Sequence, residues 1–246
     1  MMKRLNSQYA KVREKLSYFS RRPARQDVDA VKIFCIGRNK TGTTSLASFF
    51  RGNGYKVGNQ EQAELLLEDW TRRDFSRIIE YCKTAEVFQD IPFSLPDTYK
   101  ALDRAFPGSK FILSVRSSPE EWYNSLVAHH TKRFSSTAGL PPSEQDLGQF
   151  KYRRKYKGWL LFAQQAIYGY PSVPLYDKQA YMAHYEMHNA EVRDYFKSRP
   201  RDLLVLNLAD EDAFQELCQF VGLELANVVP LPHLNRSREM GGRSRR

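Results

Sequence analysis

The stretch KIFCIGRNKTGTTSLASFF, from Lys32 to Phe50, changes character twice along its length. Six largely apolar residues lead into a polar loop bounded by Gly37 and Gly42, and paired threonines then open a segment with apolar residues at helical spacing. A strand, a glycine-bounded loop and a helix in this order predict a phosphate-binding loop, because the first amides of a helix lack partners within the helix and attract anions. We therefore expect this loop to hold an anion.

The loop differs from that of nucleoside triphosphatases. The Walker pattern G-x-x-x-x-G-K-[ST] places lysine directly after the second glycine, whereas this chain has Thr43 there and Lys40 two residues before Gly42. An acidic residue that could hold magnesium is also missing directly after the apolar stretch FILSV. We therefore predict anion chemistry that needs no metal ion, and no metal site.

The composition indicates a globular protein whose positive charge lies at its two ends. The 246 residues are 41% hydrophobic, which suits one α/β domain with appendages. The formal net charge is +10, but residues 1–25 hold eight Lys/Arg against one Glu and residues 236–246 hold five Arg against one Glu, so the rest carries about −1.

No apolar run approaches the ~20 residues of a membrane span and no signal-peptide pattern is visible, so we expect a cytoplasmic protein. The three cysteines are expected to be reduced core thiols.

Strands and helices are predicted to alternate along the chain. The predicted strands are 31–37, 55–58, 85–90, 110–115 and 202–208. The predicted helices are 43–52, 60–83, 96–106, 118–133, 149–168, 178–198 and 210–221, and residues 134–148 form a long connection. This alternation predicts a three-layer α/β/α domain with a central parallel sheet of about five strands, plus extra helices. Residues 1–28 read as a basic amphipathic arm that docks on the body or contacts a membrane surface or a partner.

A second informative segment is KFILSVRSSPEEWYNSL, residues 110–126. An apolar strand delivers Arg116 at its carboxyl end, and a helix capped by Ser118 places Ser125 about two turns further on. The carboxyl ends of parallel strands line the ligand crevice, so Arg116 and the loop after Gly37 are expected on one edge of the sheet. Two anion sites on one edge suit a ligand with phosphates at both ends.

The segments GRNKTGTTSL and FILSVRSSPEEWYNSL resemble, in this order, the 5′-phosphosulfate loop and the 3′-phosphate motif of sulfotransferases that use 3′-phosphoadenosine 5′-phosphosulfate (PAPS). QDIPFSL between them and the stretch from LLVLNLADEDAFQELCQFVGL to PLPHLNRS also look like that family. The resemblance implies a P-loop-like domain over residues 29–235, with a helical acceptor or lid region at 134–200 and a basic tail at 236–246. It also implies PAPS as donor, 3′-phosphoadenosine 5′-phosphate (PAP) as product, and a small-molecule or saccharide acceptor with a hydroxyl or amine.

The resemblance also assigns residues to the donor. The implied donor-binding residues are Arg38, Asn39, Lys40, Thr41, Gly42, Thr43, Thr44 and Ser45 at the phosphosulfate, and Arg116, Ser125 and Arg236 at the 3′-phosphate. The family usually has one residue between its arginine and its proline, and this chain has Ser117 and Ser118 there. Counting from Pro119 selects Ser125.

Two residues are predicted to be catalytic. Lys40 can stabilise the negative charge that develops on the bridging oxygen during sulfuryl transfer. The acceptor hydroxyl needs a general base, which in cytosolic members of the family is a histidine in a T-H-L-P stretch, and QDIP puts Asp90 at that place. Asp90 could instead act as a helix cap or an ion-pair partner, and His129 and His130 are rival bases.

Other readings of the sequence remain open. A nucleotide or small-molecule kinase with a degenerate P-loop is the enzymatic alternative. A binder of nucleic acid or anionic membrane through the basic ends is the non-catalytic alternative, although the nearly neutral body argues against nucleic acid as a partner. His184 and His188 have a spacing that zinc can use, but core or surface histidines are favoured. KYRRKYKGW is favoured as a solvated helix with Tyr152 and Tyr156 on one face over a grip for an anionic acceptor.

Overall fold

The computed structural model describes residues 31–152 and 156–230. The N-terminal arm predicted at 1–28 lies outside these residues, and so does the C-terminal tail with Arg236. The predictions made for both ends therefore stay predictions.

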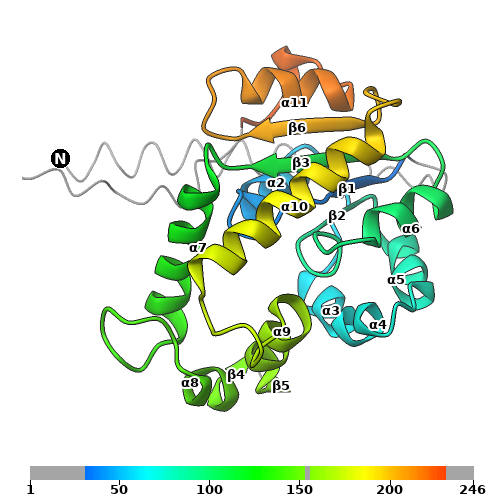
Figure 1. Ribbon diagram of the computed structural model, residues 1–246. Coiled ribbons are helices and arrows are strands. Elements are labelled where there is room, and N and C mark those ends of the chain that lie inside the picture. The colour runs from blue at the N-terminus through cyan, green and yellow to red at the C-terminus, as the bar shows by residue number, and fades with distance from the viewer. Residues whose placement is uncertain (1–30, 153–155, 231–246) are drawn as a thin grey trace, which may run out of the picture.

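Four parallel strands form the central sheet in the order β2-β1-β3-β6 (Figure 1). They are β1 (Ile33–Cys35), β2 (Val87–Gln89), β3 (Lys110–Val115) and β6 (Leu203–Asn207). The prediction of a parallel α/β sheet is confirmed, but the predicted fifth strand at 55–58 contributes only one bridge, from Val57 to Val87. Gly54 and Gly58 flank the three residues there, and glycine weakens a strand.

Helices connect the strands and cover both faces of the sheet (Figure 1). They are α2 (Thr43–Gly52), α3 (Gln60–Ala63), α4 (Leu67–Thr71), α5 (Ser76–Tyr81), α6 (Thr98–Ala105), α7 (Pro119–Phe134), α8 (Glu144–Gln149), α9 (Trp159–Tyr168), α10 (Lys178–Phe196) and α11 (Ala213–Val221), with 3₁₀ turns at Glu64–Leu66, Cys82–Thr84 and Leu225–Asn227. A separate antiparallel pair joins β4 (Lys151–Tyr152) to β5 (Tyr156–Lys157).

Alternate residues of the strands feed two apolar cores, one on each face of the sheet. The larger core contains Phe34, Ile36, Phe88, Phe111 and Leu113 together with side chains of α7, α9 and α10. The smaller core contains Ile33, Cys35, Val87, Ile112 and Leu206 together with side chains of α2 and α11. Strands buried on both faces explain the continuous apolar runs in the sequence, and helices on both sides confirm the three-layer arrangement.

Three predicted elements are wrong in detail. The predicted helix 149–168 begins only at Trp159, because residues 151–157 include the β4–β5 hairpin, in which Tyr152 pairs with Tyr156 across the two strands. The predicted helix 60–83 is broken into short helical pieces. The predicted connection 134–148 contains the start of α8, which Ser143 caps by accepting a hydrogen bond from the Asp146 amide.

The cap of α7 and the state of the cysteines agree with the sequence. The Ser118 hydroxyl accepts the Glu121 amide at 3.0 Å, and Pro119 opens the helix. The Glu121 carboxylate does not complete a capping box on Ser118, since it accepts the Ser117 amide instead. Cys35, Cys82 and Cys218 are buried free thiols. Burial raises the pKa of the Cys35 thiol to about 12, so it remains protonated.

Candidate active site

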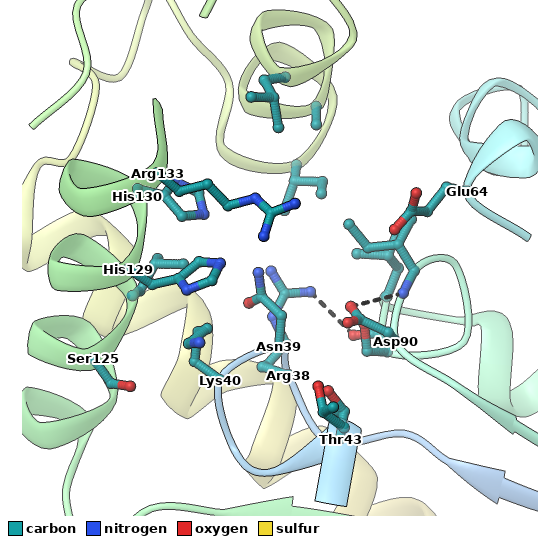
Figure 2. A pocket seen from close by; sticks show the side chains of 18 of the residues that line it. Arg38, Asn39, Lys40, Thr43, Glu64, Asp90, Ser125, His129, His130 and Arg133 are labelled. Carbon is teal, nitrogen blue, oxygen red and sulfur yellow. Dashed lines mark hydrogen bonds between the residues drawn. The ribbon is translucent and has the colours of Figure 1, made fainter. Parts of the chain in front are cut away.

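A cavity of about 380 Å³ opens where the carboxyl ends of the strands meet α7 and α9 (Figure 2). Lys40 follows β1, Asp90 follows β2 and Arg116 follows β3, and all three line this cavity. The other lining residues from the predicted site are Arg38, Asn39, Gly42, Thr43, Thr44, Ser45, Ser125, His129 and His130. The topology therefore brings residues as far apart in the sequence as Arg38 and His130 into one site, as expected for the edge of a parallel sheet.

The loop between β1 and α2 presents the start of α2 to the cavity. Gly42 is the N-cap residue, with φ of 99°, and no side chain caps the first turn of the helix. The backbone angle at Gly42 favours glycine, and a Cβ there would lie 2.5 Å from Leu208 Cδ1, so the Leu208 side chain would have to shift. The uncapped amides of Thr43 and Thr44 remain available to an anion.

Three successive carbonyls of the loop are bonded to the protein. The Arg38 carbonyl accepts the Thr41 hydroxyl at 2.6 Å, and the Asn39 carbonyl accepts the Trp122 indole N–H at 2.9 Å. The Lys40 carbonyl accepts Arg116 Nε at 2.8 Å. In these hydrogen bonds, protein donors compensate the partial negative charges of the three carbonyl oxygens. An anion among the amides of the same loop would therefore meet less repulsion.

Thr41 supports the loop from inside. Its hydroxyl donates to the Arg38 carbonyl, so the Ser114 hydroxyl, 2.6 Å away, donates to Thr41 in turn. The Thr41 side chain is 2% exposed and is not part of the cavity lining. Beside it, a Cβ at Gly37 would lie 2.3 Å from the Ser114 carbonyl oxygen, so the loop leaves the sheet in contact with β3.

One face of α7 forms a basic wall of the cavity. Ser125, His129 and Arg133 recur every four residues and all line the cavity (Figure 2). Burial and the nearby charges of Lys40 and Arg133 lower the pKa of His129 to about 4, so this imidazole is neutral at pH 7. Sequence reasoning missed Arg133, although its spacing from Ser125 was a visible signal.

His130 belongs to the packing of the wall more than to the open cavity. Its Nδ1 lies 2.9 Å from the Tyr176 hydroxyl, and its ring meets Phe134 edge-on. Burial and the neighbouring His129 lower its pKa to about 3. Of the two rival bases, His129 is thus the better placed.

Asp90 and Lys40 lie close enough to interact. Asp90 raises the pKa of Lys40, but burial and Arg116 have the larger effects and the net pKa of Lys40 is lowered. Asp90 Oδ1 accepts the Ile91 amide at 3.0 Å, which fixes the carboxylate. Both residues have positive φ angles, 69° at Lys40 and 64° at Asp90, a conformation that is unfavourable for non-glycine residues. Such strain collects at functional sites.

Arg38 is a buried cation that is hydrogen-bonded to two other residues of the cavity lining. It is 2% exposed and donates to the Ser94 carbonyl at 3.0 Å and to the Tyr168 hydroxyl at 3.3 Å. Within the described part of the chain it has no carboxylate partner at ion-pair distance, and its Nε has no hydrogen-bond partner. Unpaired buried charge is costly, so an anion in the cavity would stabilise this residue.

The remaining chemistry-bearing residues fall outside the cavity. His188 is 1% exposed and its Nε2 donates to the Ile36 carbonyl at 2.9 Å, so the favoured reading of His188 as a core histidine is confirmed. No group of three potential metal-binding side chains occurs among the residues described. None of the helices that the structure describes is long and apolar enough to cross a membrane.

Comparison with known proteins gives a family assignment. The family model described as "Sulfotransferase domain" matches residues 32–240, which include every residue that lines the cavity. No curated protein matches the chain. A match over most of the chain shows that the chain belongs to the sulfotransferase family.

Proposed function

We propose that the protein transfers a sulfuryl group from PAPS to the hydroxyl of a small acceptor. The observation that carries this proposal is the convergence of Lys40, Asp90 and Arg116, from the ends of three adjacent strands, on one cavity. The donor supplies an activated sulfuryl group, and negative charge grows on its bridging phosphate oxygen as that group leaves. The residues of the cavity can stabilise that charge and accept a proton from the acceptor, because cationic side chains, the start of α2 and a carboxylate all line it.

The start of α2 would hold the 5′-phosphosulfate. The amides of Thr43 and Thr44 supply neutral donors, and the helix dipole adds a favourable field. Arg116 and Ser125 would hold the 3′-phosphate, since both line the cavity on the side of α7. Arg116 is already fixed by its bond to the Lys40 carbonyl, so little ordering is needed when the phosphate binds.

Lys40 would stabilise the leaving oxygen. Its positive φ and its bonded carbonyl fix the direction in which the side chain leaves the loop. A fixed cation stabilises the transition state more than the ground state when charge develops next to it. Lys40→Met should therefore lower turnover by at least ~10²-fold while leaving PAP affinity within severalfold.

Asp90 would accept the proton of the acceptor hydroxyl. Asp90→Asn keeps the shape of the side chain and should lower turnover by roughly 10²- to 10⁴-fold. Asp97→Asn is a matched control, because Asp97 also has positive φ, at 63°, but pairs with Lys100 and lies outside the cavity lining. An active Asp90→Asn enzyme beside an inactive His129→Ala enzyme would make His129 the base.

The test is a transfer assay with ³⁵S-labelled PAPS, the full chain and panels of phenols, alcohols, amines and saccharides, without added magnesium. We expect one panel to yield a labelled product, and calorimetry to show PAP binding in EDTA. A chain that ignores PAP and binds ATP with magnesium would refute the donor assignment. If Lys40→Met lost affinity and turnover equally, Lys40 would only bind the donor.

A further inference from the structure

We propose that the acceptor of this site is anionic, with an apolar or aromatic body, and that Arg133 binds its anionic group. This inference rests on the proposed function and adds a substrate class to it. The carboxylate, sulfate and phosphate groups share the required oxyanion chemistry, and Arg is suited to all three.

Arg133 lies beyond the part of α7 that faces the donor. It is two helical turns, about 12 Å, from Ser125 along the helix axis, because each residue adds ~1.5 Å. The donor phosphates already have cationic and amide partners at the start of α2 and at Arg116. The guanidinium of Arg133 instead reaches over the cavity above His129 and Lys40 (Figure 2).

Nothing in the described part of the chain neutralises Arg133. No carboxylate lies within 4.0 Å of its guanidinium among residues 31–152 and 156–230, and its Cζ lies 5.8 Å from the centroid of the Phe134 ring. Lys40 and His129 both lie close enough to interact electrostatically with it. An anion placed here would relieve the repulsion between Arg133 and Lys40, so the site favours negatively charged ligands.

The surrounding wall fits an apolar body. Trp159, Leu160, Ala163 and Ile167 of α9 line the cavity. Asp90 and Glu64 lie on the opposite wall from Arg133 (Figure 2). An acceptor with its anion at Arg133 and its hydroxyl toward Asp90 would cross this apolar surface, and the two charged walls would fix its direction.

The test compares binding of matched acid and amide ligands to the full chain saturated with PAP, by calorimetry. The probes are 4-hydroxyphenylacetate, 3-(4-hydroxyphenyl)propanoate and 4-(4-hydroxyphenyl)butanoate, each beside its primary amide, so that three lengths are sampled. We expect at least one acid to bind about five- to tenfold more tightly than its amide, since the guanidinium is exposed and partly screened. Arg133→Gln should remove this preference, and Arg133→Glu should reverse it.

Lys132→Gln is the matched control, because it removes the same charge from the neighbouring exposed position, which does not line the cavity. It should retain the preference for the acid. Thermal unfolding should show that all variants fold, as expected for an exposed side chain. No acid preference in the wild type at any length, or an undiminished preference in Arg133→Gln, would overturn the inference.

The binding test separates this inference from the proposed function. If the chain bound no PAP, the same comparison without PAP would still measure the preference for acids, and only the donor assignment would fail. If sulfuryl transfer occurred equally well to acids and amides, the proposed function would stand and the anionic acceptor would be excluded.

Discussion

Arg116→Ala should weaken the binding of PAP far more than the binding of 5′-AMP, which lacks the 3′-phosphate. The Arg116 side chain is 26% exposed, with Nε on the Lys40 carbonyl and Nη1 3.2 Å from Glu121, so its remaining donors can meet a phosphate. A hydrogen bond to a charged group contributes about 1.5 to 3 kcal/mol. Partial exposure places Arg116 at the lower end of that range, which corresponds to a loss of about 10- to 30-fold for PAP.

The loss for 5′-AMP measures everything that Arg116 does apart from binding the 3′-phosphate. Its bond to the Lys40 carbonyl supports the loop at the other phosphate, so we expect a loss below about threefold for 5′-AMP. The ratio of the two losses isolates the interaction between Arg116 and the 3′-phosphate, as in a double-mutant cycle. Ser125→Ala should give the same pattern with a smaller ratio, because a neutral hydroxyl makes a weaker bond.

Isothermal titration calorimetry of both nucleotides with the wild type and the two variants is the assay. Urea unfolding should show that Arg116→Ala remains folded with a loss of about 1 to 2 kcal/mol, from one hydrogen bond and a half-exposed ion pair. Equal losses for PAP and 5′-AMP would refute the reasoning, since Arg116 would then act only through the loop.

Three further predictions concern charge, packing and pH. Glu121→Gln should tighten PAP binding by about threefold, because it removes a carboxylate next to Arg116 while keeping the Ser118 cap. Weaker PAP binding in calorimetry would mean that Glu121 mainly orients Arg116. Gly37→Ala should destabilise the protein in urea unfolding by about 3 kcal/mol or more, since no space exists for a Cβ beside β3. Gly54→Ala is the control: φ there is 83° and nothing lies within 4 Å of an added Cβ, so the free energy of unfolding should fall by only about 1 to 2 kcal/mol. The free energy of unfolding should be highest above pH 6.5 and should fall as the pH drops toward about 4. The reason is that the pKa of His129 is lowered to about 4 in the folded protein, so the unfolded chain takes up the proton at higher pH. A free energy of unfolding that stayed constant over this window would contradict the burial of the His129 ring.

The order of elements and the strand–loop–helix geometry at residues 33–52 could be predicted because local signals agreed with the tertiary structure. The run from Lys32 to Phe50 combines a buried strand, two required glycines and an uncapped helix start, and each signal is local. Ser118 and Pro119 similarly mark the start of α7 through backbone chemistry alone.

The errors lie where local signals were ambiguous. Tyr152 and Tyr156 can share one face of a helix, but the same spacing also suits two short antiparallel strands, and these are observed. The start of α8 was missed although Ser143 and Asp146 form a capping box, because the surrounding Gly, Pro and Ser suggested a loop.

Other parts of the site depend on tertiary contacts that no local pattern contains. The bond from Trp122 to the Asn39 carbonyl joins residues 83 positions apart. The contact of Arg38 with Tyr168 spans 130 positions. Neither partner could be chosen from the sequence, since each depends on how α7 and α9 pack over the edge of the sheet.

The backbone conformation at Lys40 and Asp90 is consistent with the roles proposed for their side chains. Among the described residues, five non-glycine residues have positive φ, and these two are the members of that set that line the cavity. Glycine would adopt the same angles without strain, so each position carries a side chain at a cost of about 1 to 2 kcal/mol to the fold. At Asp97 an exposed ion pair with Lys100 accompanies the same backbone angle. At Lys40 and Asp90 the side chains face the cavity from the ends of neighbouring strands, so the strain is best explained by the ammonium and the carboxylate that it holds toward a reacting group.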